Sequence, residues 1–209
     1  MKTTACESSI REFLAAIASA EGVHGAVSAA AVSGGLGVAI LMMVAALPKT
    51  KSDSADDRAK LMQAAAALND VQEQLIETIE TETAVKIYTA RNMPQLSETQ
   101  RTERQAAIQL ALRAAAEVPL EVMRLCAQGL THAETVAAHS PRAASSDVQL
   151  AVMLLETAFS GARANLEGKL SSLADAPYIT STVDEIARLS EETTTAIHGA
   201  TSFVRVPPS

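Results

Sequence analysis

Residues 25–47 read GAVSAAAVSGGLGVAILMMVAAL and contain no charged side chain. A stretch of this length and composition fits either a helix buried at the centre of a bundle, which is apolar all round, or a helix that spans a membrane. The segments after it are amphipathic and highly charged, as in soluble bundles. We therefore expect a helix surrounded by other helices, and no membrane span.

Three glycines, Gly34, Gly35 and Gly37, lie inside this predicted helix. Each glycine destabilises a helix interior by about 1 kcal/mol relative to alanine. Either the close approach of a neighbouring helix or room for a ligand must offset that loss.

The rest of the chain also predicts helices. Apolar residues make up 48% of the sequence but aromatic residues only 2%, and the apolar residues are mainly alanine, the best helix former. Apolar positions recur at helical spacing, and no strand-like alternation persists. The predicted helices cover residues 7–20, 26–47, 54–91, 97–139, a segment that begins at 146 or 147, and 181–203. The fold class is therefore all-α, an elongated up-down bundle of about six helices in one domain over residues 1–209.

The charge and the cysteine content of the chain argue against several classes of partner and location. The net charge of −7 and the lack of basic clusters argue against nucleic acid or an anionic membrane surface as partner. Cys6 and Cys126 are too few for a disulfide framework, so we expect free thiols and a cytoplasmic location. Glu7, Arg11 and Glu12 lie where a secretory signal would need apolar residues.

Several short motifs occur in a specific order along the chain, and the most persuasive is a Val-Pro-Leu inside a long helix followed by Ser-Asp at a helix start. The full set comprises Phe13-Leu14, Ser33-Gly34 with Gly37, Ala107-Ile108-Gln109, Glu117-Val118-Pro119-Leu120, Ala133-Glu134, Ser146-Asp147 and Asn165. Over about residues 10–170 this order resembles the cyclodeaminase/cyclohydrolase family. That family includes bacterial methenyltetrahydrofolate cyclohydrolases and the cyclodeaminase domain of formiminotransferase-cyclodeaminase.

The resemblance implies a reaction on a one-carbon unit carried by tetrahydrofolate, with no metal and no organic cofactor. A stand-alone chain of this length favours hydrolysis of 5,10-methenyltetrahydrofolate to 10-formyltetrahydrofolate. One alternative is the cyclodeaminase reaction, in which formimidoyltetrahydrofolate cyclises and releases ammonia. Another is a catalytically degenerate protein that binds a pterin or serves in assembly. The resemblance also implies a homodimer.

This sequence departs from the family's pattern at four places: the glycine run, the Asp-x-Glu pattern, a Lys-rich stretch that is reduced to Lys49 and Lys51, and an Asn-x-Asn pattern that keeps only Asn165. Where the family has a glycine-rich signature before the second helix, residues 22–28 keep only Gly25 of the glycine run. The family's Asp-x-Glu pattern reads Glu80-Thr81-Glu82 here, so the carboxylates remain but the aspartate does not. These departures mark a divergent member and motivate the degenerate alternative.

The predicted catalytic residues are Glu80, Asp147 and His24, because proton transfer around a tetrahedral carbon needs a positioned acid or base. Asp147 is a stronger candidate than Glu80, because a carboxylate at a helix start could also bind the guanidine-like edge of a pterin through paired hydrogen bonds. The resemblance favours Glu80, and His24 stands where the glycine signature should be, with the near-neutral reference pKa of histidine suited to proton transfer. Each has a simpler alternative role: Glu80 as a solvated charge, Asp147 as a helix cap, and His24 as a loop residue.

The predicted substrate-binding residues are Gly25, Lys51, Glu82, Ser146 and Asn165. Lysine would contact the anionic folate tail, with Lys49 and Arg163 as further options. Glu82 lies two residues from Glu80 and so does not share its helix face. Ser146 could instead cap a helix, and Asn165 could form a hydrogen bond between helices.

No metal site is expected. His132 and His139 are seven residues apart and share a helix face, but no cluster of Cys, His or Asp supplies further ligands. A phosphate-binding glycine loop and a nucleophile elbow are also absent from the sequence.

Overall fold

The computed structural model describes residues 9–19, 25–79, 92–94 and 97–204. Within these ranges it contains α-helices, one 3-10 turn and no strand, which confirms the predicted all-α class. The elements are α1 (Ile10–Ala18), α2 (Ala26–Ala45), α3 (Ala55–Ile79), α5 (Glu98–His139), η2 (Arg142–Ala144), α6 (Ser145–Leu170) and α7 (Ala176–Val204).

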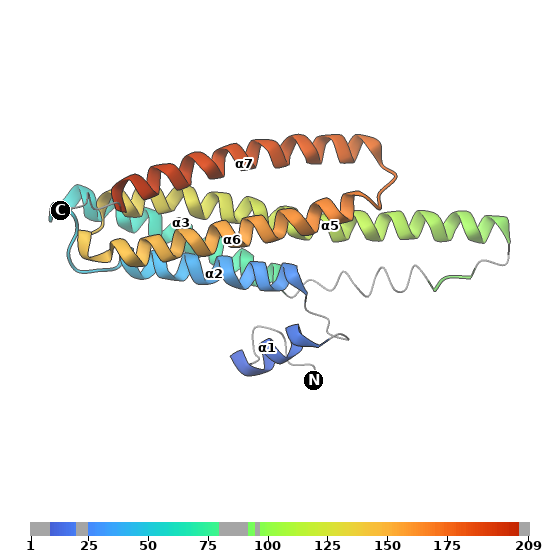
Figure 1. Cartoon of the computed structure of the whole chain (residues 1–209), viewed down its shortest axis with the longest axis horizontal. Helices are drawn as coiled ribbons and strands as arrows, with labels where there is room; N and C mark the ends of the chain where they lie inside the picture. The colour runs from blue at the N-terminus through green and yellow to red at the C-terminus, as the bar shows by residue number, and fades with distance from the viewer. Residues whose placement is uncertain (1–8, 20–24, 80–91, 95–96, 205–209) are drawn as a thin grey trace.

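The helices α2, α3, α5, α6 and α7 run up and down side by side in an elongated bundle (Figure 1). The longest, α5, has 42 residues and extends beyond the other helices at the end where it begins. Helix α1 lies apart from the bundle, on the side where α2 lies, and has no buried residue. The predicted elongated up-down bundle is therefore confirmed.

Local signals explain most helix boundaries. The Ser97 hydroxyl accepts a hydrogen bond from the Gln100 backbone N–H, and the Gln100 side chain accepts one from the Ser97 N–H, so a capping box starts α5 where the helix was predicted to begin. A similar box between Ser9 and Glu12 starts α1. Pro119 lies inside α5, as the sequence predicted, and it is buried.

One predicted helix start needs correction. Helix α7 begins at Ala176 rather than Ser181, because the Asp175 carboxylate accepts a hydrogen bond from the Tyr178 backbone N–H and Pro177 is tolerated in a first turn. Helix α6 begins at Ser145, within one residue of its predicted start and directly after a 3-10 turn that was not predicted. Helix α3 is described only as far as Ile79, so the rest of its predicted length lies outside the described residues.

Helix α2 packs so closely on α6 that one of its glycines is required for space. A Cβ atom at Gly37 would lie 2.8 Å from the carbonyl oxygen of Ala151 and 2.9 Å from Cγ of Leu155. Close helix approach thus offsets the cost of this glycine. At Gly35 no atom lies within 4 Å of the Cβ position, so packing does not require that glycine.

The prediction that α2 is surrounded on all sides is wrong for its outer side. Helix α2 is long and apolar enough to cross a membrane, but only 39% of its most apolar window is buried by the rest of the chain. Its inner side packs on α3, α5 and α6. Its outer side remains on the surface, where Leu36 and Met43 are half exposed.

Candidate functional site

The predicted site residues lie in two separate parts of the bundle. Gly25 and Asn165 lie together, as the helix packing shows below. Lys51, Ser146 and Asp147 lie at the opposite end, where α2 ends and α6 begins. The remaining three predictions, His24, Glu80 and Glu82, fall outside the described residues.

The antiparallel packing of α2 and α6 brings Asn165 to the start of α2. A Cβ at Gly34 would lie 3.5 Å from Cβ of Ala158, and a Cβ at Gly161 would lie 3.8 Å from Cβ of Ala30. One further turn along α6 leads to Asn165, level with the first turn of α2 and with Gly25.

Asn165 is a half-buried residue with an unsatisfied acceptor. Its side-chain oxygen Oδ1 is shielded from solvent and has no hydrogen-bond partner among the described residues. An unpaired buried acceptor is unfavourable by about 1–3 kcal/mol, so native proteins rarely retain one without a reason. The predicted interhelical hydrogen bond for Asn165 is not formed through this oxygen, which leaves it available to a substrate donor or a water.

Lys169 is a second polar residue at this place, and the sequence reading missed it. It lies one turn after Asn165 on the same side of α6 and is half-buried. Burial lowers the pKa of its ammonium group, which forms no ion pair or hydrogen bond with the described residues. A partly desolvated cation without a partner is suited to bind an anionic group. In the sequence, only the spacing of four residues from Asn165 indicates that Lys169 could belong to the site.

Gly25 is the N-cap residue of α2, and no side chain caps this helix start. Its φ of −127° is accessible to any residue, and a Cβ there would meet nothing within 4 Å. The first-turn N–H groups of α2 are therefore uncapped and near Asn165, and they favour negative charge.

Helix α3 approaches the same region before the described part of it ends. The Leu75 side chain lies 3.3 Å from the Cβ position of Gly34, and Ile79 packs against the core one turn later. Glu80 follows Ile79 directly in the sequence and lies outside the described residues.

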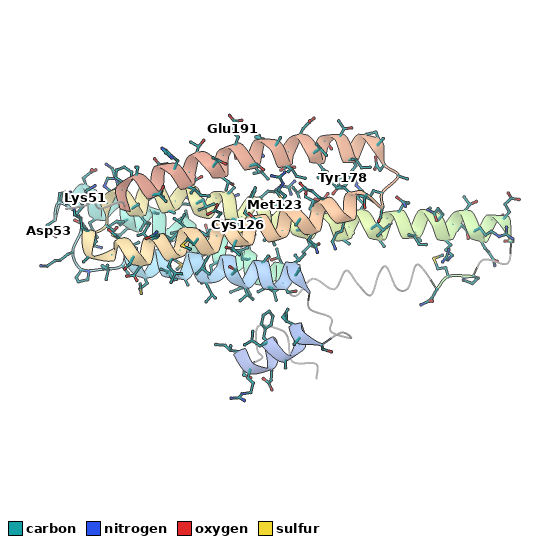
Figure 2. The ribbon with its side chains drawn as sticks, viewed as in Figure 1. Lys51, Asp53, Met123, Cys126, Tyr178 and Glu191 are labelled. Carbon is teal, nitrogen blue, oxygen red and sulfur yellow. The ribbon has the colours of Figure 1, made fainter. Side chains whose placement is uncertain are left out.

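The other end of the bundle holds Asp147, Ser146 and Lys51. Helix α6 has Ala144 as its N-cap and no side-chain cap, so neither Asp147 nor Ser146 has the predicted alternative role of capping it. Asp147 is half-buried and Ser146 is exposed. The Lys51 ammonium lies 4.9 Å from the ring centroid of Phe203, and Figure 2 shows Lys51 and Asp53 together at this end.

These two groups of residues are too far apart to share one small substrate within one chain. Asn165 follows Asp147 by 18 residues on the same helix, which corresponds to about 27 Å along its axis. The structure thus brings Asn165 to Gly25 but does not bring Asp147 to either of them.

A polar cluster of Ser52, Asp57 and His139 links the start of α3 to the end of α5 at this end of the bundle. The Asp57 carboxylate accepts hydrogen bonds from the Ser52 hydroxyl (2.5 Å) and backbone N–H (2.9 Å), and it lies 2.7 Å from His139 Nδ1. These bonds, the Ser52 hydroxyl foremost and His139 next, hold the pKa of Asp57 well below its usual range. Because the serine donates to the carboxylate and not to the histidine, the cluster is not a nucleophilic triad. It joins the start of α3 to the end of α5.

We expect Asp57→Asn to lower the melting temperature at pH 7 by roughly 5 °C, because asparagine keeps only one of the two acceptor oxygens and loses the charge, so either Ser52 or His139 is left without its partner. A depressed folded-state pKa stabilises the fold above the unfolded pKa, which is about 4, and this contribution disappears as pH falls further. The difference between wild type and variant should therefore be larger at pH 7 than at pH 3. Thermal melts across pH measure it. Asp56→Asn, at an exposed neighbour paired with Lys60, is the control and should change little. A pH-independent difference would contradict this role for Asp57.

The structure also locates Cys126 and His132, which the sequence analysis considered as a free thiol and as part of a metal site. Cys126 is fully buried, which raises the pKa of its thiol to about 12 and makes it unsuitable as a nucleophile. His132 is half-buried, and burial lowers its pKa. Among the described residues, no three His, Cys, Asp or Glu side chains are grouped so that they could hold a metal ion.

Comparison with known proteins identifies the family. A family model described as Formiminotransferase-cyclodeaminase matches residues 9–188. The chain belongs to this family. The match includes Gly25, Asn165 and Lys169 and confirms the resemblance read from the sequence motifs.

Relatives of this family member point to folate one-carbon chemistry. The chain is 28% identical over 185 residues to the methenyltetrahydrofolate cyclohydrolase of Methylorubrum extorquens, covering 88% of this chain and 89% of that protein. It is 26% identical over 182 residues to the formimidoyltransferase-cyclodeaminase of Gallus gallus, but those residues span only 34% of that longer protein.

A solved structure supports the fold. The formiminotetrahydrofolate cyclodeaminase of Thermotoga maritima superposes with a TM-score of 0.83, covering 94% of this chain and 96% of that one. At 20% identity, this likeness shows that the two proteins share the helical architecture.

Proposed function

We propose that this family member hydrolyses 5,10-methenyltetrahydrofolate to 10-formyltetrahydrofolate. Over nearly the full length of both chains it is 28% identical to a methenyltetrahydrofolate cyclohydrolase, against 20% for the cyclodeaminase of similar length, and this higher identity supports the cyclohydrolase reaction. The observation that carries the proposal is the unpartnered, buried oxygen of Asn165 at the start of α2, with the Lys169 ammonium one turn away.

The hydrolysis needs only a few acidic, basic and hydrogen-bonding side chains. Water adds to the methenyl carbon, and the C–N bond of the tetrahedral intermediate then breaks to leave the formyl group on one nitrogen. A base must take a proton from the water, and an acid must return a proton to the departing nitrogen. We assign Asn165 Oδ1 to accept a hydrogen bond from the pterin or the attacking water. We assign Glu80 as the acid and base, with His24 as the alternative, on the sequence prediction alone.

The substrate's anionic tail would pair with Lys169, and Gly25 would leave the uncapped first turn of α2 accessible to the ligand. Lys51, Ser146, Glu82 and Asp147 remain predictions from the sequence. We propose no metal and no organic cofactor, since proton transfer by side chains is sufficient for this chemistry.

A comparison of two substrates tests the proposal. Purified chain is mixed with 5,10-methenyltetrahydrofolate, whose absorbance decay is followed, and separately with formimidoyltetrahydrofolate, from which ammonia release is measured. We expect decay of the first substrate faster than in buffer and no ammonia from the second. Ammonia release alone would support the cyclodeaminase alternative. Binding of folates in calorimetry without turnover of either substrate would support the degenerate one.

We expect Lys169→Met to raise KM for 5,10-methenyltetrahydrofolate by about tenfold, because one charge-assisted hydrogen bond to the tail contributes roughly 1.4 kcal/mol. The tail is remote from the reacting carbon, so kcat should stay within about twofold. Steady-state kinetics gives both values. Lys60→Met, at an exposed lysine on α3, is the matched control and should change neither value. An unchanged KM in Lys169→Met would remove Lys169 from the site.

We also propose that the protein works in the cytoplasm as a homodimer. The reducing compartment fits the buried free thiol of Cys126. The uncharged outer side of α2 fits a subunit interface.

A further inference from the structure

A groove runs between α6 and α7, on the side of α6 that faces away from Asn165. Its volume is about 400 Å³, which lies in the range of small-molecule pockets. Helix α7 packs mainly on α5 and only lightly on α6, its antiparallel neighbour, and this leaves the space open (Figure 1). We call it the α6–α7 groove; its lining includes Glu156, Phe159, Arg163 and Glu167 of α6 and Thr193 and Ile197 of α7.

The α6–α7 groove is separate from the proposed reaction site. Asn165 lies two residues from both Arg163 and Glu167, which line the groove. Two residues correspond to a rotation of about 200° around a helix, so Asn165 lies on the other side of α6. A ligand in the groove therefore does not compete with the proposed substrate for the same side chains.

Thr193 lies at the floor of the groove and has an unpartnered hydroxyl. It is 4% exposed, and its Oγ1 has no hydrogen-bond partner among the described residues. Two neighbouring hydroxyls of the lining donate to the carbonyl oxygen one turn earlier on α7, Ser190 to Ile186 (2.6 Å) and Thr194 to Ser190 (2.8 Å). Thr193 does not form this bond. A buried hydroxyl without a partner is unfavourable, so a bound group that pairs with it would relieve this cost.

The remaining polar groups of the groove are mainly hydrogen-bond acceptors. The Glu156 carboxylate is exposed and forms no hydrogen bond or ion pair with the described residues. Ser190 and Thr194 donate their protons within α7, so toward the groove they only accept. A ligand that satisfies this lining must bring several donors of its own.

The charges of the groove favour an uncharged ligand. Arg163 is the cation of the described lining, and its Nε donates to the Glu167 carboxylate (2.8 Å) while its Nη1 reaches Ser190 Oγ (3.4 Å) on the facing helix. An anion would meet the repulsion of Glu156 and would compete with Glu167 for the guanidinium. A polycation would meet Arg163 itself, and the described residues form no group that could hold a metal ion.

Apolar side chains complete the floor of the groove. Phe159 is 5% exposed, and Ile197 is half-buried beside it. A sugar ring presents C–H groups on its faces and hydroxyls around its edge, so it contacts an apolar floor while its hydroxyls bond to the walls. Hydroxyl groups that donate to a carboxylate form strong, charge-assisted hydrogen bonds.

We propose that the α6–α7 groove binds a neutral cyclic polyol of the size of a monosaccharide. Hydroxyls of the ligand donate to the Glu156 carboxylate and pair with Thr193 Oγ1. Another ligand oxygen accepts from Arg163, whose N–H donors are not all used by Glu167 and Ser190. The inference does not depend on the proposed reaction, because binding is measured without folate.

Saturation-transfer NMR on the full chain tests the site, with D-ribose, D-glucose and myo-inositol as probes at about 10 mM. At least one probe should bind with a Kd of about 1 mM, as expected for a ligand of about 10–12 non-hydrogen atoms. Thr193→Val keeps the shape of the side chain and removes only the hydroxyl. It should raise this Kd about tenfold without lowering the melting temperature, because no hydrogen bond within the described chain is lost.

Thr201→Val is the matched control. It removes a hydroxyl of α7 that donates to the Ile197 carbonyl oxygen (2.7 Å) and does not line the groove, so the Kd should equal that of wild type. Glu156→Gln keeps one acceptor oxygen but loses the charge, and it should raise the Kd about threefold.

Three results would overturn the proposal. Absence of transfer to all three probes would exclude a polyol as the occupant. An equal Kd in wild type and Thr193→Val would place the ligand outside the groove. Transfer to putrescine, used as a cationic probe at the same concentration, with none to the sugars would assign the groove to an amine instead.

Discussion

Gly37→Ala is expected to lower the free energy of unfolding by about 2 kcal/mol. The new methyl group would lie 2.8 Å from the carbonyl oxygen of Ala151 and 2.9 Å from the Leu155 side chain. The carbonyl belongs to the backbone of α6, so the clash is relieved only if the two helices move apart. Overpacking of this kind destabilises by up to about 3 kcal/mol, and the better helix propensity of alanine returns about 1 kcal/mol.

Gly35→Ala is the matched control, because its methyl group would meet no atom within 4 Å. This variant should be more stable than wild type by about 0.5–1 kcal/mol, since only the helix propensity changes. Urea denaturation followed by circular dichroism measures both values. Equal stability of the two variants would mean that α2 and α6 are not packed as closely as the structure shows.

Asn165→Ala is expected to reduce kcat/KM for 5,10-methenyltetrahydrofolate by about 100-fold, the effect of removing one hydrogen-bonding group that acts in the transition state. The same variant should not lose stability. The buried oxygen that it removes has no partner among the described residues, so no hydrogen bond within the chain is broken at that atom.

The combination of lost activity and retained stability distinguishes a site residue from a structural one. Asn69→Ala is the control, because Asn69 is an exposed helical asparagine whose side-chain amide donates a hydrogen bond to the Glu73 carboxylate, 3.2 Å away. Its activity should match wild type. If Asn165→Ala lost stability in proportion to activity, Asn165 would have a packing role instead.

The helices could be predicted because their signals are local. Ser97 with Gln100 fixed the start of α5 within one residue, and the uncharged stretch after Gly25 fixed the start of α2. The start of α7 was predicted five residues too late, at Ser181 instead of Ala176, although a proline in the first turn fits a helix that Asp175 caps.

The site was only partly predictable because it depends on contacts between distant segments. Asn165 stood out as an asparagine inside a helix, but the missing partner of its oxygen is visible only in the packed bundle. Lys169 carries no motif, and its burial follows from how α6 is oriented. The contact between Asp57 and His139 joins residues 82 positions apart, which no pattern in the sequence links.

The outer side of α2 shows how composition can mislead. A helix without charges is expected to be covered, and the sequence does not say whether its own chain or another molecule covers it. The bundle covers only the inner side of α2, so we expect another molecule to cover its outer side.

The most direct test of the central claim is the decay rate of 5,10-methenyltetrahydrofolate absorbance at increasing concentrations of purified chain. Hydrolysis by this protein predicts a rate that rises in proportion to protein concentration, with 10-formyltetrahydrofolate as the product. It also predicts that Asn165→Ala loses this acceleration. A rate equal to that in buffer at every protein concentration would contradict the proposed function.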